Sequence, residues 1–161
     1  MTFDSWKESV PEAITADSLW KMKAYRLALF VSDVCWRDVK NIVQERTMRS
    51  LADQLYRSVG SVSVNIAEGY SRGMGKDRAR FYEYALGSAR ESRDWYYKAR
   101  FMLGEEVTEH RLSLMSEVIK LLLTMTPQQR GEQIREPAET YAANGEQLDL
   151  DALLESIPFP E

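Results

Sequence analysis

Residues 61–72, with the sequence SVSVNIAEGYSR, decide the fold of this chain. They place small residues, a carboxamide and a carboxylate within one run in which apolar residues recur every three to four positions, which is typical of a helix. Asn65 and Glu68 are three residues apart and so share one helix face. A second segment, residues 85–91 (ALGSARE), repeats the small-residue spacing. Glycine costs about 1 kcal/mol inside a helix, so Gly60, Gly69 and Gly87 predict two helices in close backbone contact.

The same periodicity, followed outward, predicts four long helices. The first begins at residue 17 or 18 and the second near residue 47, where Thr47 is a candidate cap. The third covers residues 76–103 and stops at Gly104, and the fourth covers residues 105–129 in spite of Pro127. Because the intervening loops are short, the sequence predicts an all-α, up-down-up-down antiparallel four-helix bundle.

The predicted core of this bundle follows the helical stripes. It contains Leu55, Val59, Val62, Ile66, Phe81, Ala85, Trp95, Leu112, Ile119 and Leu122. The first helix has a stripe through Leu19, Met22, Leu29, Trp36, Val39 and Val43, widened by Ala28, Val31, Val34 and Cys35. A helix that is apolar around much of its circumference packs on two sides. We therefore expect self-association, with this helix and parts of the next two at the subunit contacts.

The regions outside the bundle differ in composition. Residues 1–16 contain Pro11 and no long periodicity, so we interpret them as an arm, residues 17–130 as the bundle and residues 131–161 as an acidic C-terminal tail. Composition favours an irregular, partly disordered tail. The alternative is that its apolar residues dock on a neighbouring surface; these are Leu150, Leu153, Leu154 and Phe159.

Charge is unevenly distributed along the chain. The net charge is −4, yet residues 46–103 carry eleven Lys or Arg against six Asp or Glu, and residues 131–161 carry one Arg against eight acids. The middle (+5) therefore suits phosphate contacts, whereas the tail (−7) opposes them. The candidate nucleic-acid contacts are Arg49, Arg57, Arg72, Lys76, Arg78 and Arg80. We expect weak, salt-sensitive binding of RNA or DNA.

The sequence offers little for catalysis. A di-iron bundle needs two Glu-x-x-His motifs, but the single histidine, His110, follows Val107 at that spacing. The single cysteine, Cys35, has no neighbouring base and is interpreted as a small buried residue. Residues 73–77 (GMGKD) are too short for a phosphate-binding loop. We predict a protein that is not an enzyme, with no catalytic residue, cofactor or metal.

Three polar residues interrupt the helical stripes, namely Asn65, Glu68 and Glu91. A carboxylate inside a bundle must be paired or protonated, and the candidate partners are Arg57, Arg72, Arg80 and Arg90. One interpretation is that these polar groups are structural and fix helix register. The other is that they form a binding site.

The chain begins without a basic segment followed by an apolar one, so we expect no signal peptide. No apolar run approaches the ~20 residues that cross a bilayer. These features predict a soluble, cytoplasmic protein that does not enter a membrane.

The chain resembles the four-helix-bundle family of 23S rRNA intervening-sequence proteins. The resemblance rests on residues 65–69 (NIAEG), Arg72, Phe81, residues 85–88 (ALGS) and Glu91. The resemblance implies a left-handed up-down bundle that assembles into homopentameric rings. Some members of the family are encoded within inserts in rRNA genes. The resemblance also implies a non-enzymatic oligomeric scaffold or accessory protein. A relative of the same fold is the accessory subunit of diversity-generating retroelements, which implies the alternative, a nucleic-acid-binding factor that works with a reverse transcriptase.

Overall fold

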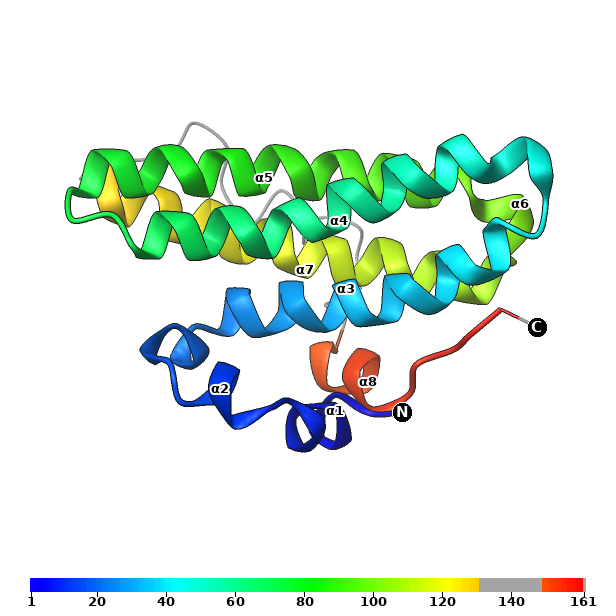
Figure 1. The fold of residues 1–161 in the computed structure, drawn as a ribbon, viewed down its shortest axis with the longest axis horizontal. Coiled ribbons are helices and arrows are strands. Elements are labelled where there is room, and N and C mark those ends of the chain that lie inside the picture. Colours follow the sequence, from blue (N-terminus) through cyan, green and yellow to red (C-terminus); the bar gives the residue numbers. More distant parts are fainter. Residues whose placement is uncertain (131–148, 161) are drawn as a thin grey trace.

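The structure, a computed structural model, describes residues 1–130 and 149–160. Its four long helices are α3 (Lys23–Ile42), α4 (Arg49–Tyr70), α5 (Gly75–Lys98) and α7 (Glu105–Arg130), and they lie side by side along the long axis (Figure 1). The described residues contain no strand. The predicted all-helical fold with four long packed helices is therefore confirmed, and the handedness of the bundle stays a prediction.

The long helices pack in the order of the chain, with α3 on α4, α4 on α5 and α5 on α7. Four residues join α4 to α5, and the short helix α6 (Arg100–Leu103) with Gly104 joins α5 to α7. Gly104 has a φ of 79°, a positive value that glycine adopts readily because it has no Cβ. Such short connections force neighbouring helices to run antiparallel.

The core confirms seven of the ten predicted residues, and the other three are half-buried. The buried seven are Leu55, Val59, Val62, Ile66, Ala85, Ile119 and Leu122. The half-buried three are Phe81, Trp95 and Leu112. On α5 the prediction was wrong by about one residue, because Tyr82 and Tyr96 are buried where Phe81 and Trp95 were expected. The hydroxyl of Tyr96 donates to Asp38, and a tyrosine with a satisfied hydroxyl is readily buried.

The first long helix begins later than expected, and most but not all of its predicted apolar face is buried. Asp17 caps a separate short helix, η1 (Ser18–Lys21), by accepting from the backbone of Leu19, so α3 begins only at Lys23. Two residues assigned to the apolar stripe are exposed: Trp36 is 54% exposed and Val43 is 36% exposed. The other predicted residues Leu19, Ala28, Val31, Val34, Cys35 and Val39 are buried as expected, and Leu27, Phe30, Asp38 and Ile42 are buried as well.

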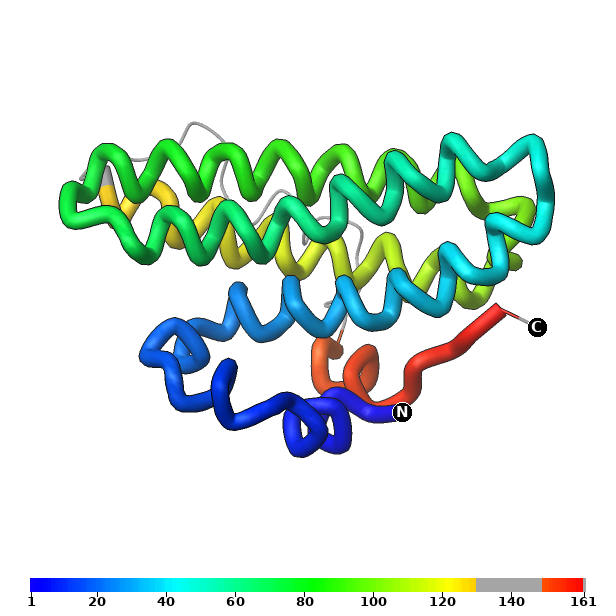
Figure 2. Tube along the Cα trace, viewed as in Figure 1, coloured from blue at the N-terminus to red at the C-terminus, as the bar shows by residue number. Residues whose placement is uncertain are grey.

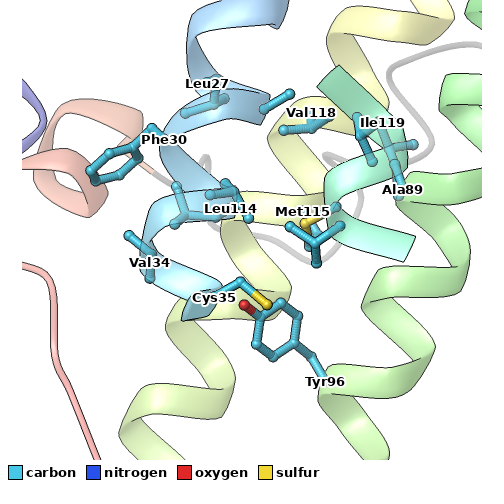
Figure 3. Packing of buried hydrophobic residues seen from close by; sticks show 14 of the residues in the cluster. Leu27, Phe30, Val34, Cys35, Ala89, Tyr96, Leu114, Met115, Val118 and Ile119 are labelled. Carbon is cyan, nitrogen blue, oxygen red and sulfur yellow. The ribbon is translucent and has the colours of Figure 1, made fainter. Parts of the chain in front are cut away.

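The N-terminal arm covers the side of α3 that faces away from the bundle. It contains α1 (Phe3–Ser9) and α2 (Glu12–Thr15). The Trp6 ring lies 5.2 Å from that of Phe30, and its indole N–H donates to Asp33 over 2.6 Å. Figure 3 shows Phe30 turned away from the other labelled core residues. The arm thus covers part of the wide apolar circumference of α3, while Trp36 remains exposed.

The C-terminal segment, residues 149–160, also packs against this side of the molecule (Figure 2). Its helix α8 (Leu150–Glu155) is capped by Asp149 and contacts α1 and α7. Leu153, Leu154 and Phe159 pack on the core cluster, as the docking interpretation expects, and Ile157 is buried as well. The rest of the predicted acidic tail, residues 131–148, lies outside the described residues. No helix in the two described ranges has both the length and the apolar character needed to cross a membrane.

The glycines separate into two kinds, which gives a test of the helix packing. A Cβ on Gly69 would lie 2.7 Å from the Tyr82 ring, whereas one on Gly60 would have no atom within 4 Å. Gly69→Ala is expected to lower the free energy of unfolding by about 1–3 kcal/mol through overpacking. Gly60→Ala in the same helix should raise it by about 0.4–1 kcal/mol. Urea titration measures both, and equal effects would contradict close packing at Gly69.

Candidate functional site

The three polar residues of the 61–91 region make only local contacts. The Asn65 amide donates to the Ser61 carbonyl over 2.8 Å, one turn earlier. Glu68 is exposed, with its carboxylate 3.9 Å from the Arg72 guanidinium. Glu91 is exposed and accepts from the Trp95 indole over 3.1 Å. The expectation of carboxylates inside the bundle was therefore wrong, because both point to the surface, where neither needs a buried partner.

These residues also lie at different levels of the helix pair. Ser92 donates to Ser58 across the α4–α5 contact, which places Glu91 level with Val59 in this antiparallel pair. Val59 precedes Asn65 by six residues, a separation of about 9 Å along the helix. The structure thus brings Asn65 and Glu68 together on one helix and leaves Glu91 apart from them. A single pocket that holds all three is not formed.

The outer surfaces of α4 and α5 are open around these residues. Val64 is 55% exposed on α4, and Tyr84 is exposed on α5. A Cβ on Gly87, as on Gly60, would touch nothing within 4 Å. The expectation that Gly60 and Gly87 permit close contact between these two helices was wrong, whereas Gly69 does serve that purpose. Packing within the chain therefore does not explain why small residues occupy these two surface positions.

Basic and aromatic side chains meet at the turn between α4 and α5. We call Arg72, Arg80, Phe81 and Tyr84 the Arg72 cluster. The Arg72 guanidinium lies 4.5 Å from the Phe81 ring centre, and Arg80 Nε donates to the Tyr84 hydroxyl over 2.6 Å. That hydrogen bond raises the pKa of Arg80. With Asp77 the cluster lines a shallow pocket of about 330 Å³. It offers cations and aromatic rings at one exposed place.

The six predicted nucleic-acid residues do not form one stripe. Arg72, Lys76, Arg78 and Arg80 lie at or near the α4–α5 turn. Arg49 begins α4, more than twenty residues earlier, which is about 30 Å away. Arg57 lies within α4 and pairs with Asp53 at 3.7 Å. Arg78 has a structural role, because its guanidinium donates to the Gln129 side chain and to the Arg72 carbonyl. The exposed basic residues at the turn are therefore Arg72, Lys76 and Arg80.

Sequence reasoning missed the most buried polar cluster, which we call the Arg111 network: Asp38, Tyr96, His110 and Arg111. Asp38 and Arg111 are completely buried, and two hydrogen bonds of 2.8 and 3.0 Å join their side chains. The Tyr96 hydroxyl donates to the same carboxylate over 3.1 Å. The network links α3, α5 and α7. The available signal was Asp38, a charge one turn after Val34 and one turn before Ile42 in an apolar stripe.

Each polar side chain of the Arg111 network has a hydrogen-bond partner. His110 Nε2 lies 2.8 Å from the Leu153 carbonyl, which only accepts, so Nε2 carries the proton and Nδ1 accepts from Arg111. Burial lowers the pKa of His110, and the Arg111 charge lowers it further. Burial raises the pKa of Cys35, beside Tyr96, to about 12 (Figure 3). The thiol is therefore protonated at neutral pH and lacks the thiolate that nucleophilic attack requires.

In residues 1–130 and 149–160, no three His, Cys, Asp or Glu side chains are gathered closely enough to hold a metal ion. The arrangement of Asp38, His110 and Arg111 instead fixes helix positions and presents hydrogen-bond donors to the C-terminal segment.

Comparison with known proteins identifies the bundle. Residues 20–124, from η1 through most of α7, match the family described as 23S rRNA-intervening sequence protein. The chain belongs to this family. A solved structure of a protein of unknown function from the S23 ribosomal protein family of Bacteroides thetaiotaomicron has the same fold, with a TM-score of 0.61 and 22% identity. The match covers 64% of this chain and 97% of that one. No curated protein matches. The N-terminal arm and the C-terminal segment of this intervening-sequence protein lie outside the family match.

Proposed function

We propose that this protein is a non-enzymatic, oligomeric scaffold or accessory protein. The observation that carries the proposal is the exposure of three of the residues by which the chain resembles its family. Glu68, Gly87 and Glu91 lie on the outside of α4 and α5 and contribute nothing to the core. Contact with another copy of the chain gives them a role that packing within one chain does not.

The chemistry of the interior supports a protein that is not an enzyme. The Cys35 thiol has a pKa of about 12 and is buried. The carboxylate of Asp38 is held by Arg111 and Tyr96, and both ring nitrogens of His110 are engaged. No titratable group of the Arg111 network is left to exchange a proton with a substrate.

The exposed apolar residues support a proposed contact between copies of the chain. Trp36 and Tyr56 are exposed on α3 and α4 with ring centres 5.9 Å apart, and Val64 lies two turns beyond Tyr56. Exposed aromatic residues are enriched at subunit interfaces. With Gly87, these residues make a surface that a second helix can approach closely. A pentamer, as the family resemblance implies, is the proposed state.

Mass measurement in solution tests this proposal. We expect a mass near 93 kDa, five times 18.6 kDa. Val64→Arg should lower the mass, because it places a charge in the proposed contact, while helix content stays unchanged. Ile14→Arg, at an exposed apolar residue of α2, is the matched control and should leave the mass as it is. A wild-type mass of one chain at all concentrations would overturn the proposal.

A second candidate, a nucleic-acid-binding accessory factor, rests on the Arg72 cluster. Single-stranded nucleic acids bind where cations lie beside aromatic rings on which bases stack. Arg72, Arg80 and the exposed ring of Tyr84 provide both. An oligomer would multiply this weak site by raising the effective concentration. A reverse transcriptase is the proposed protein partner in this case.

A salt titration with single-stranded RNA separates the two candidates. We expect weak binding by the full chain that falls steeply as salt rises, because phosphate contacts release counterions. The double variant Arg72→Ala/Arg80→Ala should weaken it about tenfold or more and make it less dependent on salt, because two cations that contact phosphate are removed. Arg57→Ala, on the same helix but paired with Asp53, is the control. Binding that ignores salt or the double variant would exclude the Arg72 cluster.

A further inference from the structure

The C-terminal segment is held by donors that the Arg111 network fixes in place. Arg111 Nη2 donates to the Pro158 carbonyl over 2.7 Å, and His110 Nε2 donates to the Leu153 carbonyl over 2.8 Å. Asp38 holds the guanidinium of Arg111 by two hydrogen bonds. The two donors are therefore in position before any peptide arrives, which lowers the entropy cost of binding one.

Apolar and cationic contacts complete this recognition. The Phe159 ring lies 4.6 Å from the Arg37 guanidinium and 5.6 Å from that of Arg111. Ile157 is 8% exposed and joins the core cluster. Pro158 and Pro160 restrict the backbone on both sides of the ring to extended conformations. The surface thus contacts an extended peptide at two carbonyls, one aliphatic side chain and one aromatic ring.

Charge complementarity extends the contact to α8. A cavity of about 440 Å³ is lined by residues of α1, α3 and α8. Lys7, Lys23 and Arg26 line it from the arm and the bundle, and Asp151 and Glu155 line it from α8. Asp4 is also at the cavity and pairs with Lys7 at 2.6 Å. The basic side chains of the bundle therefore face the acidic side chains of the segment.

All the groups that are recognised belong to the segment itself. A helix of six residues is not stable in isolation, so α8 is ordered by docking, as a bound ligand would be. Residues 131–148 join it to Arg130, and eighteen residues span at most about 65 Å. The distance along α7 from Arg130 back to His110 is about 30 Å at 1.5 Å per residue. The eighteen joining residues are therefore long enough for the segment to reach the docking surface of its own chain or that of an adjacent copy.

We propose that the surface formed by Arg37, His110 and Arg111 is a peptide-binding site, and that residues 150–160 of a second copy of the chain occupy it by exchange for the chain's own segment. Exchange keeps every contact that the segment makes within one chain, which is why it is a low-cost route to association. The site is separate from the outer surfaces of α4 and α5, so the inference does not depend on the proposed oligomer.

Two full-length variants test the recognition and then the exchange. Variant A, Ile157→Ala/Phe159→Ala, keeps the site and loses the segment's anchors. A fluorescent peptide of residues 149–160 should bind variant A saturably, and the same peptide with Phe159→Ala should bind about tenfold or more weakly, as for loss of an aromatic anchor. Equal binding of both peptides, or none by a variant A whose helix content is normal, would overturn the site.

Variant B, Arg37→Glu/His110→Ala, keeps the segment and loses the site. Variant A and variant B should associate when mixed, because the segment of B enters the site of A. The matched control is variant B with Phe159→Ala added, which should associate with variant A about tenfold or more weakly. Any oligomer built on α4 and α5 contributes equally to both mixtures, so the difference reports the exchange alone. Equal association in the two mixtures would overturn it.

Discussion

Replacing Arg111 by Ala is expected to lower the free energy of unfolding by about 3–5 kcal/mol, because it leaves the fully buried Asp38 carboxylate without its cation. Among the hydrogen bonds of the described residues, the one from the Tyr96 hydroxyl then remains to stabilise that charge. Urea denaturation followed by circular dichroism measures the change. The effect should be among the largest of any single substitution in this chain, since such losses are exceptional for point mutants.

Two further variants make this expectation specific. Arg57→Ala breaks an exposed pair with Asp53 and should cost less than about 1 kcal/mol. The double variant Asp38→Leu/Arg111→Met removes both charges together and should recover most of the loss, because an apolar replacement of a buried pair is often neutral or stabilising. If Arg111→Ala costs no more than Arg57→Ala, the pair is not buried in solution.

Truncating the core at Ile66 or Leu122 is the second large effect that we expect. Both side chains are completely buried, one on α4 and one on α7. Ile66→Ala and Leu122→Ala should each lower the free energy of unfolding by about 2–5 kcal/mol, the range for a buried aliphatic cut back to Ala. Thermal denaturation would show this as a clear fall of the midpoint.

Val43→Ala is the control for these substitutions. Val43 follows the end of α3 and is exposed, so its truncation should change stability by no more than about 0.5 kcal/mol. A midpoint that Ile66→Ala and Leu122→Ala leave unchanged would show that the helical faces of α4 and α7 are assigned wrongly.

The long helices were predictable because their apolar residues recur at helical spacing, and α4 shows this best. Leu55, Val59, Val62 and Ile66 are all buried as predicted. On α5 the same reasoning chose Phe81 and misjudged which aromatic rings face inward, because hydropathy ranks tyrosine below phenylalanine and tryptophan. Whether a tyrosine is buried depends on a partner for its hydroxyl, and that partner comes from another helix.

The Arg111 network lay beyond sequence reasoning for a related reason. Asp38 and Arg111 are 73 residues apart, and nothing local pairs one with the other. The docking of residues 150–160 depends in turn on that pair, because Arg111 donates to Pro158. The basic residues were counted correctly along the chain, but helix length separates Arg49 from Arg72, so a charge total could not indicate a single stripe.

The packing order of the helices has a consequence for the order in which they open and close. The contact between α4 and α5 joins residues close in sequence and can form early, because a short loop closes at little entropic cost. The helix α3 makes its main contact with α4 alone and touches α7 far less. Its attachment to the far side of the bundle relies on Asp38 and Arg111, a contact that closes a long loop. Of the four long helices, α3 is therefore the one that detaches first in partial unfolding, and its amide hydrogens exchange with solvent before those of α5.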